Sequence, residues 1–289
     1  MRIPLAGGGQ ETLLSEVGAQ YLLPLLSTRD ACALRLVCRE FLAAVSEQPW
    51  EDRGTVIKGS IAAWRACFPR ACCANVQKVD MEHLQWSWGA PNKHAPVVDA
   101  DFVHFEGLRE LYMAGCKDVT DAAIVHLHGI HTLDMSWCDQ RAITDAAFTH
   151  LAGIQRLSIM TSLQANITDA AFVHLRGIQL LNMSNCQQLT DAAFVHLRGI
   201  HTLYMWNCRA VTDAAFAHLR GIHTLLIGQG GQVTVTGAAF AHLKGIQALG
   251  TYGCSDEQVA AARSLGLPVY TRKCASYSPL LCTFAKERE

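Results

Sequence analysis

The apolar and polar positions of this chain repeat at intervals of 22 or 24 residues over more than half its length. The block Thr-Asp-Ala-Ala-Phe begins at residues 144, 168, 190 and 212, and weaker copies begin at Val98, Thr120 and Thr236. A second block has its central leucine at positions 111, 133, 157, 181, 203, 225 and 249. So regular a spacing predicts a repeat architecture, in which each unit buries one face and neighbouring units stack into a continuous core.

Each block predicts one element of the repeat. Threonine is a good N-cap and the following aspartate suits the positive end of a helix, so Thr-Asp-Ala-Ala-Phe-x-His-Leu predicts a short helical turn. The glycine after it is expected to end the turn in the left-handed conformation. Leu-x-Met or Leu-x-Ile then predicts a short strand with its two apolar residues facing inward. The glycines in question are residues 129, 153, 177, 199 and 221.

Residues 11–52 do not follow the repeat. An apolar helix is predicted from Leu13 to Leu23, where Pro24 interrupts it. A second helix is predicted over residues 30–41, with apolar residues at 34, 37, 38 and 41, and Pro49-Trp50 lies just beyond it. This segment therefore predicts a separate, small helical unit.

The segments beside the repeats are less regular. We predict a helix over residues 61–67, an irregular first strand at 76–81 and an insertion loop at 83–96. After the repeats, an alanine-rich helix follows Ser255-Asp256, and residues 267–270 are expected to close the stack. The predicted organisation is a flexible leader (1–10), the helical unit (11–52), an irregular repeat with its loop (53–96), the regular repeats (97–254) and a capping segment (255–289).

Composition narrows the possible roles. Of the 289 residues half are hydrophobic and 17% are charged, and the formal net charge is -1. That charge offers no basic field for a nucleic acid or an anionic membrane. No apolar run approaches the roughly 20 residues of a membrane span, and the first residues are too soon interrupted by glycines for a signal peptide. We expect an intracellular protein, cytoplasmic or nuclear, with reduced thiols.

Histidine and cysteine are frequent, and both invite a metal-site interpretation. Seven histidines recur once per repeat, and a stacked, half-exposed ladder explains them better than a metal site, because no C-x-x-C pair accompanies them. The cysteines behave as small hydrophobic residues near backbone carbonyls. No G-x-S-x-G, P-loop or dinucleotide-binding motif is present, so we expect no catalytic residues, no metal and no cofactor. The histidines are residues 104, 126, 150, 174, 196, 218 and 242.

The repeat resembles a known family. The pattern Ile200-x-x-Leu203-x-Met205-x-x-Cys208-x-x-Val211 is similar to a leucine-rich repeat of the cysteine-containing subclass, and the match covers residues 97–254. The resemblance implies an α/β fold, a right-handed solenoid with a curved parallel sheet. Its ladder cysteines are residues 116, 138, 186, 208 and 254, and Ser162 and Gly230 stand in the other two copies.

The helical unit resembles an F-box, in Leu34-Arg35-Leu36-Val37-Cys38-Arg39 and in Pro49-Trp50. One departure is Leu13-Leu14, where the family has Leu-Pro. The resemblance implies that the F-box binds a Skp-type adaptor and through it a cullin–RING complex, while the repeats bind a target protein for ubiquitin transfer. Such a chain is a non-catalytic substrate receptor. The residues expected to form or support the adaptor surface are Leu13, Leu14, Leu26, Leu34, Val37, Cys38 and Trp50.

The concave face of the predicted sheet is the expected target-binding surface. Core packing explains the leucines and methionines but not an outward Trp206 beside Tyr204, and large exposed aromatic side chains often mark binding sites. The alternative is that these rings shield strand edges or contact the tail. A second functional interpretation is a leucine-rich-repeat scaffold that does not act in ubiquitination. The predicted target-binding residues are Tyr112, Asp134, Tyr204, Trp206 and Tyr252.

Overall fold

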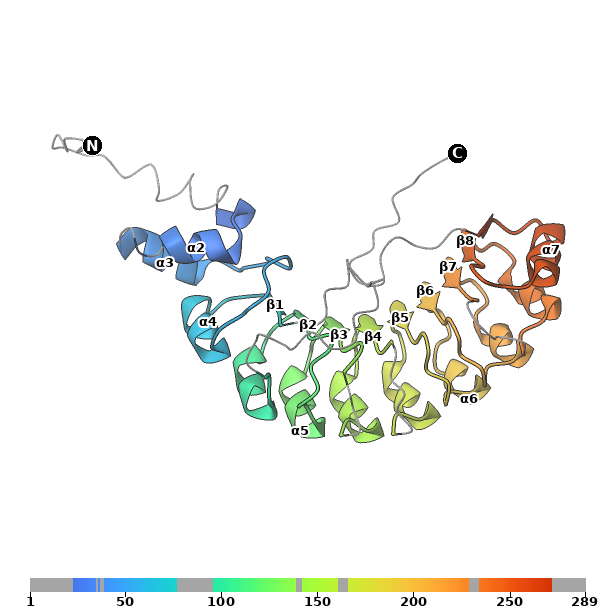
Figure 1. Ribbon diagram of the computed structural model, residues 1–289, viewed down its shortest axis with the longest axis horizontal. Coiled ribbons are helices and arrows are strands. Elements are labelled where there is room, and N and C mark those ends of the chain that lie inside the picture. Colours follow the sequence, from blue (N-terminus) through green and yellow to red (C-terminus); the bar gives the residue numbers. More distant parts are fainter. Residues whose placement is uncertain are drawn as a thin grey trace. The chain divides into compact units, whose positions relative to one another are not determined.

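The computed structural model describes residues 23–34, 36, 39–76, 96–138, 142–160, 166–228 and 234–271 (Figure 1). The chain divides into two compact units between Asn75 and Val76. Of the residues with predicted roles, Leu13, Leu14, Val37 and Cys38 lie outside the described residues, as does most of the predicted strand at 76–81.

The first unit is mainly helical. The helix predicted over residues 61–67 is confirmed, with Ser60 as its N-cap. The prediction of one helix over 30–41 is wrong, because the chain forms two helices there. The N–H of Leu36 donates to the carbonyl of Ala33 at 3.2 Å, a tight turn directly after the first of them. The elements are η2 (Leu23–Leu25), α2 (Thr28–Leu34), α3 (Arg39–Glu47), α4 (Ile61–Cys67) and strand β1 (Cys73–Asn75).

Trp50 holds the first unit together. Its Nε1 donates to the carbonyl of Val45 at 2.7 Å, and its ring packs edge-on against Phe68 with centroids 5.2 Å apart. Its own carbonyl accepts the N–H of Cys72 at 2.8 Å. Since only 3% of Trp50 is exposed, it joins the end of α3 to the segment after α4 from the inside.

Asp52 fixes the start of α2. Its carboxylate accepts the backbone N–H groups of Thr28, Gly54 and Thr55 at 2.6, 2.9 and 3.1 Å. Burial alone raises the pKa of Asp52, but hydrogen bonds from Thr28 and Thr55 outweigh it and bring the pKa below its usual value. The charged carboxylate is thus the form that stabilises this turn.

The second unit is a solenoid of parallel strands. Strands β2 to β9 lie side by side in sequence order, and the central leucines are in register from Leu111 to Leu249. These leucines are completely buried, which confirms the predicted core. The strands are β2 (Glu110–Tyr112), β3 (Thr132–Asp134), β4 (Arg156–Ser158), β5 (Leu180–Asn182), β6 (Thr202–Tyr204), β7 (Thr224–Leu226), β8 (Ala248–Gly250) and β9 (Val269–Tyr270).

Short helices follow the strands along the outer side of the solenoid (Figure 1). The predicted caps are confirmed: in the repeat of Thr144, for example, its Oγ1 accepts the N–H of Ala146 at 3.2 Å. The five predicted glycines have φ between 76° and 88°. Most of the turns are 3-10 rather than α-helical. They are η3 (Asp99–Phe105), α5 (Asp121–Ile124), η4 (Val125–Leu127), η5 (Asp145–Leu151), η6 (Asp169–Leu175), α6 (Asp191–Phe194), η7 (Asp213–His218) and η8 (Gly237–Leu243).

An Asp–Thr ladder connects these helices. The carboxylate of Asp169, for example, accepts both the N–H of Thr190 at 2.9 Å and its hydroxyl at 2.6 Å. The first residue of one helix therefore binds the N-cap threonine of the next. The pairs are Asp99–Thr120, Asp121–Thr144, Asp145–Thr168, Asp169–Thr190, Asp191–Thr212 and Asp213–Thr236.

The ladder ends where α7 (Asp256–Ser264) covers the last repeat. Gly237 replaces the aspartate there, and a Cβ on Gly237 would lie 2.6 Å from the Cβ of Ala261 in α7. The predicted alanine-rich helix after Ser255 is confirmed, and β9 pairs with β8 as expected of a closing strand. Glycine at position 237 is thus required by the close approach of the capping helix.

Candidate functional site

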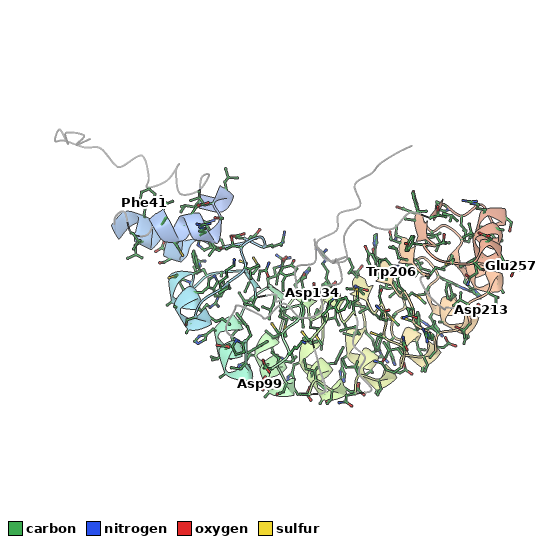
Figure 2. The ribbon with its side chains drawn as sticks, viewed as in Figure 1. Phe41, Asp99, Asp134, Trp206, Asp213 and Glu257 are labelled. Atoms are coloured by element: carbon green, nitrogen blue, oxygen red, sulfur yellow. The ribbon has the colours of Figure 1, made fainter. Side chains whose placement is uncertain are left out.

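The concave face is formed by the first and third residues of each strand, because the middle leucine faces the core. Asp134 and Trp206 lie on the inner side of the sheet, and Asp99 and Asp213 lie on the outer side (Figure 2). The third-position residues differ in type along the solenoid. They are Tyr112, Asp134, Ser158, Asn182, Tyr204, Leu226 and Gly250.

The middle of the concave face is apolar. Tyr204, Trp206 and Leu226 form a buried cluster, and the half-buried Leu180 packs against it. The expectation that Tyr204 and Trp206 are exposed is wrong, because they are only 3% and 8% exposed. Tyr204 is in register with Leu226 on the neighbouring strand. At the strand spacing of about 4.8 Å, such large side chains cover one another.

The concave face near β2 to β4 carries polar groups that are hydrogen-bonded to one another. The carboxylate of Asp134 accepts the N–H of Ser136 at 3.0 Å, and the hydroxyls of Ser136 and Ser158 lie 2.6 Å apart. The hydroxyl of Tyr112 donates to Glu110 at 3.0 Å. Tyr112 and Asp134 are each 1% exposed, so they too are buried rather than open.

Tyr252 differs from the other predicted target-binding residues because it is half-buried. The five residues thus lie in or directly after strands of one sheet, but four of them are buried. Their role in target binding stays a prediction. The burial of Tyr204 and Trp206 agrees with the alternative stated above, in which these rings shield strand edges.

The ladder cysteines pack as expected, near backbone carbonyls. The thiol of Cys138 donates to the carbonyl of Met113 at 3.3 Å, and that of Cys208 donates to the carbonyl of Met183 at 3.2 Å. Burial, with the nearby Cys186, raises the pKa of Cys208, and burial raises the pKa of Cys254 to about 11. Protonated thiols are poor nucleophiles, so these cysteines act in packing.

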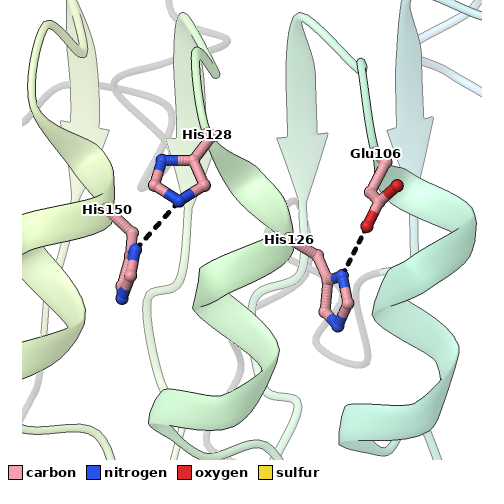
Figure 3. Close-up of polar contacts among 4 residues, drawn as sticks. All are labelled: Glu106, His126, His128 and His150. Carbon is pink, nitrogen blue, oxygen red and sulfur yellow. Dashed lines mark hydrogen bonds and ion pairs between the residues drawn. The ribbon is translucent and has the colours of Figure 1, made fainter.

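The histidine ladder lies at the ends of the helices, and its members are half-buried as expected. His126 Nδ1 lies 2.7 Å from a carboxylate oxygen of Glu106, and His150 Nδ1 lies 3.0 Å from His128 Nε2 (Figure 3). Within the described ranges, no group of three or more histidine, cysteine, aspartate or glutamate residues could hold a metal ion. The contacts of His126 and His150 are therefore pairs between neighbouring repeats.

The first unit carries the second candidate surface. Of the predicted adaptor-binding residues that the structure describes, Leu26 and Leu34 are half-buried, and Trp50 is buried. The indole of Trp50 therefore supports this unit from within and presents no surface. Two leucines that sequence reasoning left out are highly exposed: Leu25 at 80% and Leu36 at 90%. Leu36 falls outside the helical spacing of the segment, which is why the pattern did not select it.

Comparisons with known proteins support the fold. No family model and no curated protein matches the chain. A chain of the TLR13–ssRNA13 complex is 17% identical with a TM-score of 0.51, over 80% of this chain and 37% of that one. A chain of the Drosophila Toll–Spätzle complex is 12% identical with a TM-score of 0.46, over 74% and 31%. A chain of the yeast Rad7–Elc1 complex is 17% identical with a TM-score of 0.38, over 61% and 44%.

This chain spans less than half the length of each of those three matched chains. The match to the TLR13 chain, together with the ordered parallel strands and their outer helices, shows a leucine-rich-repeat solenoid, an α/β fold. In the part of the chain that the structure describes, no helix is both long and apolar enough to span a membrane.

Proposed function

We propose that this chain is the substrate-recognition subunit of an SCF-type ubiquitin ligase. In this proposal the first unit is an F-box that binds a Skp-type adaptor, and the solenoid binds the target protein. The adaptor brings a cullin–RING complex, and catalysis belongs to those other subunits, so this chain acts without an active site of its own.

The observation that carries the proposal is the exposure of leucines in the first unit. Leu25 and Leu36 flank α2 and leave 80% and 90% of their surface in contact with water, and Leu42 on α3 leaves 40%. Apolar side chains so exposed within one small helical unit are typical of a surface that another protein covers. They lie within the segment that resembles an F-box, where the family binds its adaptor.

The solenoid supports the second half of the proposal. Its core positions repeat, whereas its concave positions change from Asp134 to Tyr204 to Gly250 along the array. Repeat proteins commonly use such extended concave surfaces for binding. In this proposal the target-binding surface is shaped by Tyr112, Asp134, Tyr204, Trp206 and Tyr252.

The alternative is a leucine-rich-repeat scaffold that binds proteins outside ubiquitination. Leu14 favours it, because the F-box family has proline at that position. The two functions differ in one property: only the ligase subunit needs the adaptor.

An adaptor pull-down tests the proposal. Wild-type chain should retain a purified Skp-type adaptor, and Leu36→Asp should reduce retention about tenfold or more, because the charge would be desolvated in the interface. Leu265→Asp is the matched control, since Leu265 is 49% exposed but lies in the second unit. It should leave adaptor retention unchanged.

Absence of retention by the wild-type chain would overturn the ligase proposal. Equal losses in Leu36→Asp and Leu265→Asp would show that the first unit is not the adaptor surface. If the adaptor binds, a second experiment distinguishes a ligase subunit from a scaffold. Proteins captured by the solenoid are added to a reconstituted ubiquitination reaction, and only a ligase subunit should promote ubiquitin transfer to them.

A further inference from the structure

The residue two positions after each ladder histidine lies at the C-terminal end of a helix or a few residues beyond it, and these residues form a second row beside the histidines. Arg176 and Lys244 are the C-cap residues of η6 and η8, as His128 is of η4. A residue of this row can reach the ladder histidine of the next repeat, since the Nε of Arg198 donates to Nδ1 of His218 at 3.4 Å. The row consists of Glu106, His128, Ala152, Arg176, Arg198, Arg220 and Lys244.

The two ends of this row differ in the charge of their residues. At the first repeats, Glu106 pairs with the ladder histidine His126, and His128 pairs with the ladder histidine His150 (Figure 3). The last four members are all cations. Each of them is exposed, and a half-buried histidine stands two residues before each one.

No acid of the same repeats neutralises these cations. Between residues 166 and 245 the sequence has three acids, Asp169, Asp191 and Asp213, and each is the first residue of its helix. Their carboxylates already accept two hydrogen bonds each from the next threonine. The cations follow the opposite ends of those helices.

Helix architecture does not require a cation at this position. A positive charge is favourable near a helix C-terminus, but the helices here are short and the effect is small at an exposed site. Glu106 and Ala152 occupy the same position in other repeats. Four like charges on successive repeats also repel one another. The basic row therefore adds little to the stability of the solenoid, and among the described residues between 166 and 245 no acid compensates its charge.

We propose that the row of Arg176, Arg198, Arg220 and Lys244 binds an acidic peptide segment of a partner protein. Carboxylates of an extended acidic segment would pair with successive cations, and the guanidinium groups can bind carboxylates through two parallel hydrogen bonds. A nucleic acid fits less well, because the whole chain has a net charge of -1 and so offers no extended basic field to a phosphate backbone. This site does not depend on the ubiquitin-ligase proposal.

Fluorescence anisotropy with the purified full-length chain tests the site. The probes are a labelled peptide of alternating Glu and Gly and its Gln–Gly counterpart. The Glu peptide should bind, and more weakly at about 150 mM salt than at low salt, whereas the Gln peptide should not bind. Arg198→Ala/Arg220→Ala should weaken binding of the Glu peptide about tenfold.

The design controls for charge and for folding. Alanine already occupies this position at Ala152, so the double substitution copies a residue that the repeat accommodates. Arg209→Ala/Arg263→Ala removes the same net charge from exposed sites outside the row and should leave binding within about twofold of wild type.

Three results would overturn the proposal. Equal binding of the Glu and Gln peptides by the wild-type chain would show that the row does not recognise carboxylates. Equal losses in the two double variants would show a diffuse charge effect. Tighter binding of an oligouridine than of the Glu peptide would identify a nucleic-acid surface.

Discussion

The Asp–Thr ladder and the concave face lie in the same repeats, but the repeats contribute to them in different ways. Each rung of the ladder uses the same two residue types with the same geometry, from Asp99–Thr120 to Asp213–Thr236. The concave positions change from strand to strand, and yet many of them are buried and bonded to their neighbours. A residue type that varies from repeat to repeat is therefore not a sign of a purely functional position, because the variable concave face also stabilises the fold.

The largest expected effect comes from Trp206. Trp206→Ala should reduce the free energy of unfolding by about 3 kcal/mol, since it removes a buried aromatic side chain from the cluster with Tyr204 and Leu226. Urea denaturation measures the change. Tyr252→Ala, at a half-buried position of the same face, is expected to cost about 1 kcal/mol. A loss below about 0.5 kcal/mol for Trp206→Ala would show that the ring contributes little to the stability of this cluster.

A broken rung of the ladder should have a smaller effect. Asp169→Ala leaves the N–H and hydroxyl of Thr190 without their acceptor, and we expect a loss of about 1–2 kcal/mol at this exposed site. The same denaturation experiment measures it. Glu257→Ala, an exposed acid of α7, is the control and should change the free energy of unfolding by less than about 0.5 kcal/mol. If Asp169→Ala and Glu257→Ala change the free energy of unfolding equally, the Asp–Thr ladder does not stabilise the fold.

The smallest expected effect is a pH dependence at His201, just before β6. Its ring stacks on that of His223 with centroids 4.1 Å apart. Burial, and then His223, lower the pKa of His201 below 6.5, so the folded protein binds the proton less readily than the unfolded chain. The neutral form of His201 therefore favours the folded state. Its contribution to the free energy of unfolding is complete above pH 6.5 and is lost as the pH falls from 6.5 toward the lower pKa of the folded protein.

His201→Gln should reduce this dependence between pH 7.5 and pH 5.5, as thermal unfolding at the two values would show. Glutamine occupies the same register in Gln155, Gln179 and Gln247, so it suits the position. His196→Gln, in the outer ladder, is the control. An unchanged pH dependence in His201→Gln would show that the stack does not couple to folding.

The sequence predicts features that depend on local chemistry within one repeat. The leucine core, the threonine caps and the left-handed glycines follow from periodicity and from the preferences of single residues. Features that depend on contacts between repeats are not predictable in this way. Nothing in Thr-Asp shows that Asp169 bonds to Thr190, and nothing in Leu-Tyr-Met-Trp shows that Leu226 covers Tyr204.

The first unit shows a second kind of limit. Apolar spacing predicts one helix through residues 30–41, but the chain turns at Leu36 and leaves that leucine in water. Apolar spacing describes which residues share a helix face, and it carries no information about a residue that a partner covers. The exposed fractions of Leu25 and Leu36 therefore add these two leucines to the adaptor surface that the sequence predicts.

The Asp–Thr rung has a consequence for how such an array can change in length. Each repeat offers the acceptor to the repeat after it and the donor to the repeat before it, and the rung joins residues 21 or 23 positions apart equally well. A duplicated repeat inserted anywhere inside the array would meet a compatible neighbour on both sides. The two ends of the array differ: Val98 stands in place of the threonine in the first copy, and Gly237, which lies against Ala261 of α7, stands in place of the aspartate in the last. An internal repeat can therefore be added or removed without loss of a rung at the new junction, while the closing end of the protein stays the same.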